Sequence, residues 1–214
     1  MNHSPISLIL VLTLLLLIPS AGRAKLTLGP FLFINSTSFS GDVLPGFSYA
    51  SQAKPGGGIM FDYYLKDDVT LSLQPMIVQK GSDLVRKRQG QVIDHVEFDL
   101  TYLSLPLALK VTGTSRSRMY VSGGLELNFL LDATQTDDLG EQSVKDDFES
   151  IELNAHFGVG GLIAVGSNYI FVEGRYTQGL SDILANSRDD LISIKTVSYM
   201  LLAGFLFQLG GSTP

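Results

Sequence analysis

The chain contains no cysteine and only three histidines among its 214 residues. Without cysteine, a disulfide framework, a cysteine-ligated metal site and a thiol nucleophile are all excluded. His3, His95 and His156 are too few and too far apart in the sequence to predict a histidine-built metal site. We therefore expect no metal and no cofactor, although carboxylate sites remain open.

Positive charge and long apolar runs are also scarce. The chain has 15 Lys and Arg against 21 Asp and Glu, so no basic surface of the nucleic-acid-binding type is expected. Beyond residue 24, no stretch approaches the roughly 18 consecutive apolar residues of a membrane-spanning helix. If the mature chain crosses a membrane, it must cross it with strands.

The first 24 residues have the character of an export signal. Residues 6–18 are almost entirely apolar, and Gly22 and Ala24 place small residues at the positions that a signal peptidase requires. We therefore predict a cleavable signal peptide over residues 1–24 and one domain over residues 25–214. The residues before the apolar run include no Lys or Arg, so an uncleaved membrane anchor is the alternative.

The dominant signal after residue 25 is a period of two, which is typical of β-strands and is not produced by a helix. Residues 69–78 show it, with Val69, Leu71, Leu73, Pro75 and Ile77 on one face and Thr70, Ser72, Gln74 and Met76 on the other. We predict eight such segments: 26–35, 56–66, 69–80, 95–111, 118–131, 149–164, 169–179 and 194–208.

The lengths of these segments and of their connections favour a membrane barrel. Each segment has about 10 residues or more, which suits a tilted strand crossing a bilayer. Short connections near residues 66–68, 112–117 and 165–168 alternate with long ones at 36–55, 81–94, 132–148 and 180–193. This rhythm predicts an all-β fold, an eight-stranded antiparallel up-and-down transmembrane β-barrel in the outer membrane, with periplasmic N- and C-termini.

Two details of this barrel allow alternatives. In segment 95–111 the apolar residues move from even to odd positions near Tyr102, which a β-bulge between Tyr102 and Leu103 would explain. Projection of the outer half of this strand beyond the membrane is the alternative. Aromatic residues near the short turns and the C-terminus suggest interfacial girdles, although strands favour aromatics in general: Phe61, Tyr63, Tyr64, Tyr120, Tyr169, Phe205 and Phe207.

Three stretches resemble a known family. Residues 57–81 form a strand, a tight turn and a strand ending in Lys-Gly, residues 102–110 read Tyr-Leu-Ser-Leu-Pro-Leu-Ala-Leu-Lys, and residues 171–180 contain Glu-x-Arg-Tyr and end in Gly-Leu. These stretches resemble the outer-membrane β-barrel domain family, including PorT-like and porin-family outer-membrane proteins of Bacteroidetes-type bacteria. The resemblance implies a barrel architecture and does not indicate an activity, since most members of the family have none assigned. PorT itself is associated with secretion and gliding machinery.

If apolar faces point outward, a set of polar side chains lies inside the barrel: Asp62, Gln74, Lys110, Glu126, Asn128, Glu152, Asn154, His156, Glu173, Arg175 and Lys195. We predict a structural polar network in the lumen made of Lys110, Glu126, Glu152, His156, Glu173 and Arg175. In this network Lys110 and Arg175 would neutralise the three glutamates, because buried charges must be paired. A gated pore or a proton path through the same residues is the alternative.

Catalytic residues are not predicted. His156 shares a face with Glu152 and Asn154, but no Gly-x-Ser-x-Gly nucleophile motif accompanies them. The third long connection is acidic, which favours a solvated surface over a calcium site because the Asp-x-Asp-x-Asp-Gly pattern is absent. The second is basic and could meet anionic headgroups or the acidic connection; its residues are Lys80, Arg86, Lys87 and Arg88.

Taken together, these patterns predict a structural or binding role through extracellular loops. The expected partners are outer-membrane lipids, lipopolysaccharide and a protein, among them a component of secretion or gliding machinery. A narrow porin-like passive channel is the first alternative, followed by a barrel enzyme and a soluble lipocalin-like carrier. The lumen discriminates between them: a closed charge network favours the structural role, a continuous aqueous path the channel, and an apolar cavity the carrier.

Overall fold

The computed structural model describes residues 26–41, 47–88, 91–113, 118–137, 140–183 and 194–209. Its strands are β1 (Leu26–Gly41), β2 (Phe47–Tyr64), β3 (Val69–Leu73), β4 (Met76–Arg88), β5 (Gln91–Thr112), β6 (Arg118–Asp137), β7 (Gly140–Ser143), β8 (Ile151–Val165), β9 (Asn168–Gly179) and β10 (Ile194–Leu209). A 3-10 turn, η1 (Lys145–Asp147), follows β7. The predicted signal peptide lies outside the described residues.

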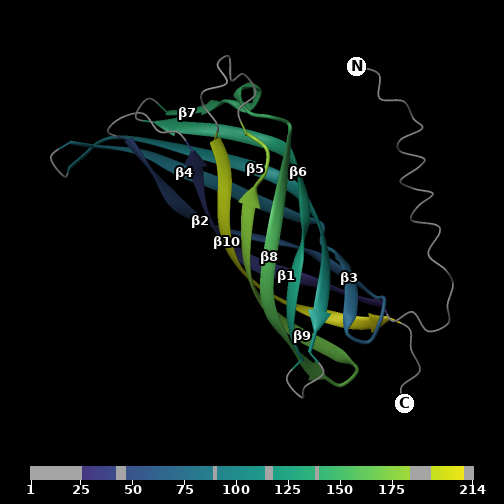
Figure 1. The fold of residues 1–214 in the computed structure, drawn as a ribbon. Helices are drawn as coiled ribbons and strands as arrows, with labels where there is room; N and C mark the ends of the chain where they lie inside the picture. The colour runs from purple at the N-terminus through teal and green to yellow at the C-terminus, as the bar shows by residue number, and fades with distance from the viewer. Residues whose placement is uncertain are drawn as a thin grey trace, which may run out of the picture.

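These strands form a closed antiparallel ring (Figure 1). Each wall strand pairs with its neighbours in the chain, and β1 pairs with β10 to close the ring. Strands β3 and β4 share one place in the wall, interrupted at Gln74 and Pro75, because proline has no N–H to donate to the ladder. Strand β7 pairs only with the end of β6. The wall therefore has eight strand positions, which confirms the predicted barrel.

The barrel is strongly staggered. Residue pairs can be followed once around the wall from Thr27 through Asp62, Ser72, Ala108, Gly124, His156, Thr177 and Ser198. This path returns to β1 at Thr37 instead of Thr27. A stagger of this kind tilts the strands against the barrel axis, as Figure 1 shows, and in an eight-stranded barrel the interior has just the width that side chains fill.

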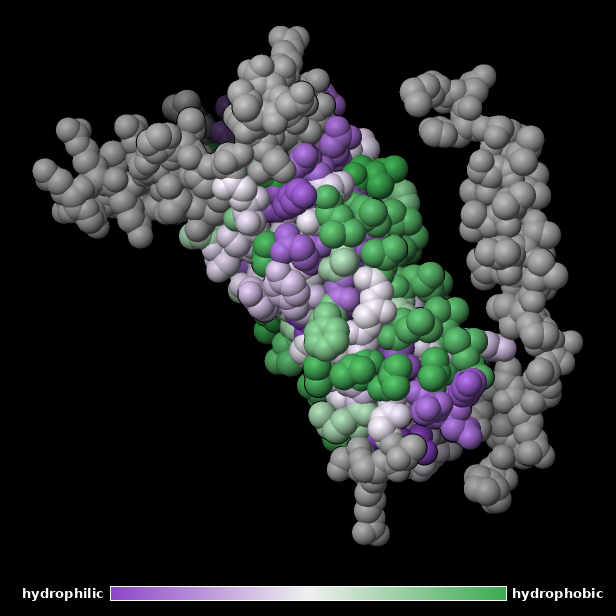
Figure 2. Space-filling model, viewed as in Figure 1, coloured by the Kyte–Doolittle hydropathy of each residue, from purple (hydrophilic) through white to green (hydrophobic). Residues whose placement is uncertain are grey.

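Large apolar side chains cover the outside of the wall. Leu32 and Ile34 in β1 are 74% and 61% exposed, and the other wall strands contribute similar residues. Figure 2 shows these residues gathered around the middle of the visible face, with hydrophilic residues toward both ends. A soluble carrier would not present such a surface to water, so the lipocalin-like alternative does not fit. Within the part of the chain that the structure describes, no helix is long and apolar enough to cross a membrane.

The long connections differ from the prediction at three places. One is 132–148, which is mostly strand because β6 continues to Asp137 and β7 covers Gly140–Ser143. Only residues 42–46 separate β1 from β2, and only residues 89–90 separate β4 from β5. The predicted long connections 36–55 and 81–94 are therefore mostly strand. Apolar alternation stops where the outward face becomes polar, but backbone hydrogen bonding continues, so a hydropathy pattern underestimates strand length. The predicted tight turn between β8 and β9 is present, with Gly166 at φ +63°.

The phase change in segment 95–111 has a different origin from the predicted bulge. From Leu100 to Lys110 the even-numbered residues of β5 face inward, and Leu100, Tyr102 and Ser104 are all fully buried. The shifted register lies across from them: Thr101 pairs with Asp132 and Tyr102 with Leu130, so Leu131 is the extra residue and belongs to β6. Along β5 the inward lining changes from apolar, at Leu100 and Tyr102, to polar, at Ser104 and Lys110. The outward face changes the opposite way, from the polar Asp99 and Thr101 to leucines.

The aromatic girdle is only partly present. Phe61 and Phe207 are exposed on the outside of the wall, where an interfacial girdle would lie. Tyr120 is different: its ring is 2% exposed and belongs to the interior. The interfacial prediction was wrong for Tyr120, because it lies on the inward-facing side of β6 with Ser122 and Glu126.

Candidate functional site: the buried polar network of the lumen

The interior of the barrel is lined by buried polar side chains from most wall strands. All six residues predicted for the lumen network face inward and are at most 5% exposed: Lys110, Glu126, Glu152, His156, Glu173 and Arg175. Lys195 was also predicted inside, but it is only partly buried and its neighbour Thr196 occupies the inward position.

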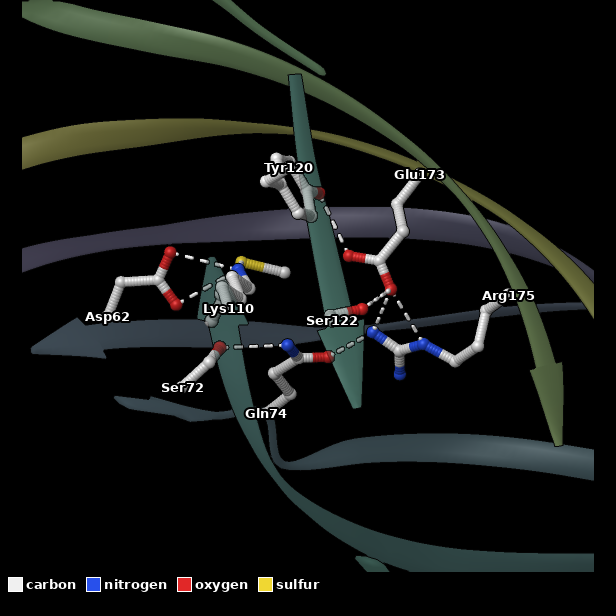
Figure 3. A network of polar contacts seen from close by, with 9 residues as sticks. Asp62, Ser72, Gln74, Lys110, Tyr120, Ser122, Glu173 and Arg175 are labelled. Atoms are coloured by element: carbon white, nitrogen blue, oxygen red, sulfur yellow. Dashed lines mark hydrogen bonds and ion pairs between the residues drawn. The ribbon is translucent and has the colours of Figure 1, made fainter. Parts of the chain in front are cut away.

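Arg175 and Glu173 form the centre of one cluster (Figure 3). The Arg175 guanidinium donates to Glu173 Oε1 from Nε at 2.8 Å and from Nη2 at 2.7 Å. Tyr120 donates its hydroxyl to Glu173 Oε2 at 2.8 Å, and Arg175 Nη2 also donates to Gln74 Oε1 at 2.6 Å. The amide of Gln74 donates in turn to Ser72. The strand β9 therefore supplies an ion pair that is held by side chains from β3, β6 and the Gln74–Pro75 interruption.

Lys110 belongs to a second ion pair beside this cluster. Its ammonium lies 2.9 Å from Asp62 Oδ2 and 2.9 Å from Met60 Sδ, and it faces the rings of Tyr120 and Phe171 at 5.3 and 5.9 Å. The expectation that Lys110 neutralises a glutamate is therefore wrong. The carboxylate that pairs with Lys110 is Asp62 on β2, with β3 between the two strands. Their proximity depends on the register of the strand pairing, which the sequence alone does not give.

A third cluster surrounds Lys80, which sequence reasoning had placed among the basic residues of a loop. Lys80 is fully buried in β4 and lies 2.8 Å from Glu152 Oε2 and 3.7 Å from Glu126 Oε1. Glu152 also accepts a short hydrogen bond from the hydroxyl of Thr196. The signal that could have found Lys80 is the alternation of β4, since it follows Met76 and Val78 on the same inward face.

Asn154 links Lys80 to β6. In the amide orientation that satisfies its surroundings, Asn154 Oδ1 accepts from Lys80 Nζ at 2.7 Å and from Asn128 Nδ2 at 3.0 Å, and its Nδ2 donates to Glu152 Oε1 at 3.1 Å. Two of the ammonium protons of Lys80 are then directed at Glu152 and Asn154. Glu126 is left with the longer, weaker contact.

His156 forms no hydrogen bond with any of the three clusters. Its two ring nitrogens have no hydrogen-bond partner among the described residues. Glu152 is committed to Lys80 and Thr196, so the His156, Glu152 and Asn154 constellation is not assembled as an acid–base unit. Among the residues that the structure describes, no group of three or more His, Cys, Asp or Glu side chains could hold a metal ion.

Apolar side chains cover the network toward the end of the barrel at which β4 ends and β5 begins. Leu100 is paired with Lys80 in register, and the Tyr102 ring lies 5.1 Å from the Lys80 ammonium. Beyond them, the Phe98 ring packs against Phe39 in a tilted and against Phe148 in an edge-on arrangement, each with ring centroids 6.3 Å apart. The arrangement is a charged interior under an aromatic layer, and its contacts leave the polar side chains inaccessible to solvent.

A closed eight-position barrel with an apolar exterior and an ion-paired interior defines a small membrane β-barrel of the outer-membrane class. The chain belongs to the family described as Outer membrane protein beta-barrel domain, whose model matches residues 25–185. No curated protein matches the sequence.

Solved structures of small outer-membrane proteins are similar in fold. The solid-state NMR structure of AlkL in DMPC lipid bilayers covers 92% of this chain and 97% of its own, at 14% identity and a TM-score of 0.50. OprG from Pseudomonas aeruginosa has 15% identity, a TM-score of 0.48 and coverages of 88% and 97%. Ail, the attachment invasion locus protein of Yersinia pestis, has 12% identity and a TM-score of 0.44, and the match covers 85% of this chain and 98% of Ail. At sequence identities this low, the similarity shows a shared fold and nothing about function.

Proposed function

We propose that this outer-membrane barrel is closed to solutes and has a structural or binding role through its outer end, without catalysis. The observation that carries this proposal is the ion-paired interior. Lys80, Lys110 and Arg175 each contact a carboxylate, and all of these side chains are almost fully buried. A passive channel needs a continuous aqueous path, and a charge network of this density opposes it.

The orientation follows the usual rule for such barrels. β1 begins and β10 ends at the same end of the wall, since Leu26 pairs with Leu209, and the tight β8–β9 turn lies at that end too. Short turns of outer-membrane barrels face the periplasm, so we place both termini there and the opposite end outside the cell. Surface proteolysis of intact cells tests this: cleavage in the β6–β8 connection supports it, and protection of that connection contradicts it.

The outer end carries the proposed binding surface. In its described part, the connection between β6 and β8 exposes four carboxylates, Glu141, Asp146, Asp147 and Glu149, and Asp132 is exposed nearby on β6 itself. Such a surface suits a basic protein partner, or lipopolysaccharide phosphates bridged by divalent cations. Membership of the PorT-like group, and a place in secretion or gliding machinery, stay predictions that would identify such a partner.

Planar-bilayer recording of the purified, refolded protein tests the closed lumen. We expect no reproducible conductance steps from the wild type. A double variant, Glu173→Ala with Arg175→Ala, removes one ion pair together and serves as the positive comparison, because it enlarges the interior without leaving an unpaired charge. If the wild type shows discrete conductance steps, and the double variant shows steps of larger conductance, the proposal is contradicted and the channel is supported.

A further inference from the structure

The charges buried inside the barrel do not balance. Among the described residues that are buried, the interior holds four carboxylates and three cationic side chains. The carboxylates are those of Asp62, Glu126, Glu152 and Glu173, and the cations those of Lys80, Lys110 and Arg175. With His156 neutral, one negative charge remains without a partner of its own.

The contacts show which carboxylate this is. Glu173 is bound by Arg175, Asp62 by Lys110, and Glu152 by Lys80. Glu126 is fully buried, and neither of its oxygens accepts a hydrogen bond. Its contact with Lys80 is 3.7 Å long, and the ammonium is already directed at Glu152 and Asn154. An uncompensated ionised carboxylate in a low-dielectric interior is strongly unfavourable.

Other unpartnered oxygens lie on positions next to Glu126 in the wall. Asn128 lies two residues along β6 on the same face; its amide nitrogen donates to Asn154, and its Oδ1 has no partner. Ser104 in β5 is paired with Asn128 in register, and its hydroxyl also has no partner. Directly paired positions bring side chains to within about 5.5 Å of each other at Cβ. Both side chains are fully buried.

We propose that the Glu126 carboxylate, Asn128 Oδ1 and Ser104 Oγ form a buried site for one small monovalent cation. Oxygen donors are the ligands that hard cations prefer, and one positive charge makes the buried ionic groups neutral overall. A divalent ion does not suit the site, since only one carboxylate is available and Lys80 lies beside it. The occupant that fits this set of oxygen donors is an alkali ion, Na⁺ or K⁺.

The test is urea unfolding of the full mature chain in lipid vesicles, followed by far-ultraviolet circular dichroism. Na⁺ or K⁺ replaces choline at constant ionic strength and pH. If an alkali ion occupies the site, the wild-type folding equilibrium constant rises about a hundredfold when the ion reaches about one hundred times its Kd. Glu126→Gln keeps the side-chain shape, removes the charge and is expected to lose this response. Glu141→Gln, at an exposed position on β7, is the matched control and is expected to keep it.

A wild-type midpoint that does not distinguish Na⁺ or K⁺ from choline would overturn the proposal. Ser104→Ala keeps the charge and loses one oxygen, so an alkali-ion response shifts to concentrations roughly tenfold higher; it also tests the site if Glu126→Gln does not fold. Equal responses of the wild type and Glu126→Gln to Na⁺ or K⁺ would overturn the proposal as well.

Discussion

Lys80 provides the sharpest test of the buried network. It is the cation nearest to two carboxylates, Glu152 at 2.8 Å and Glu126 at 3.7 Å, and all three side chains are fully buried. Lys80→Met keeps the length of the side chain and removes the charge. Breaking a buried ion pair by removing one partner costs about 3–5 kcal/mol. Because Lys80→Met leaves Glu152 without its cation and Glu126 without the nearest positive charge, we expect a loss at the upper end of this range.

The measurement is the free energy of unfolding in urea, with the barrel folded into vesicles. The chain has no tryptophan, so circular dichroism or the gel mobility of the folded form is the readout. The double variant Lys80→Met with Glu152→Gln removes the pair together and should recover most of the loss, since replacing a whole buried pair is often nearly neutral. Lys145→Met, at an exposed position, is the control. A loss below about 1 kcal/mol for Lys80→Met, the range of exposed pairs, would refute the network.

Three further predictions concern the packing of the wall and its faces. Gly158→Ala would place a Cβ 2.6 Å from Glu173 Oε1 and should destabilise the barrel by about 1–3 kcal/mol in the same urea assay. Gly174→Ala is the control and should be tolerated, because the atom nearest to its added Cβ is 4.0 Å away. Equal effects of the two variants would contradict the interior packing. Tyr120→Phe removes the hydrogen bond to Glu173 Oε2 and should cost about 1.5–3 kcal/mol, as for bonds to charged groups, and an unchanged midpoint would show that the carboxylate is satisfied otherwise. Leu32→Arg on the outward face should cost about 2–4 kcal/mol in vesicles, and Leu32→Ala clearly less; tolerance of the arginine would place this position outside the bilayer.

The period of two carries most of the fold information in this sequence. Alternating faces, as in residues 69–78, depend only on the backbone geometry of a strand, so they could be interpreted without knowing any partner strand. The same local rule placed Glu126, Glu152, His156, Glu173 and Arg175 in the interior. Where polar residues continued the ladder, as at the ends of β1 and β4, hydropathy gave no sign of it, and the strands were predicted too short.

The partners inside the barrel could not be obtained in this way. Asp62 joins Lys110 across β3, and Lys80 reaches Glu152 across the lumen, between strands 72 residues apart in the chain. Both contacts depend on the register of every pair around the ring and on the stagger that returns Thr27 to Thr37. A one-residue shift in any pairing reverses which side chains face inward, so the extra residue in β6 was attributed to β5.

The sequence by itself determined the class of the protein: a barrel with an apolar outside and charged inside, because alternation and segment length are local properties. Only the tertiary structure decided how those charges are paired. The side chains meet across a closed wall whose geometry is fixed by all the strands at once. It is this closure that leaves Glu126 as the buried carboxylate without a cation of its own.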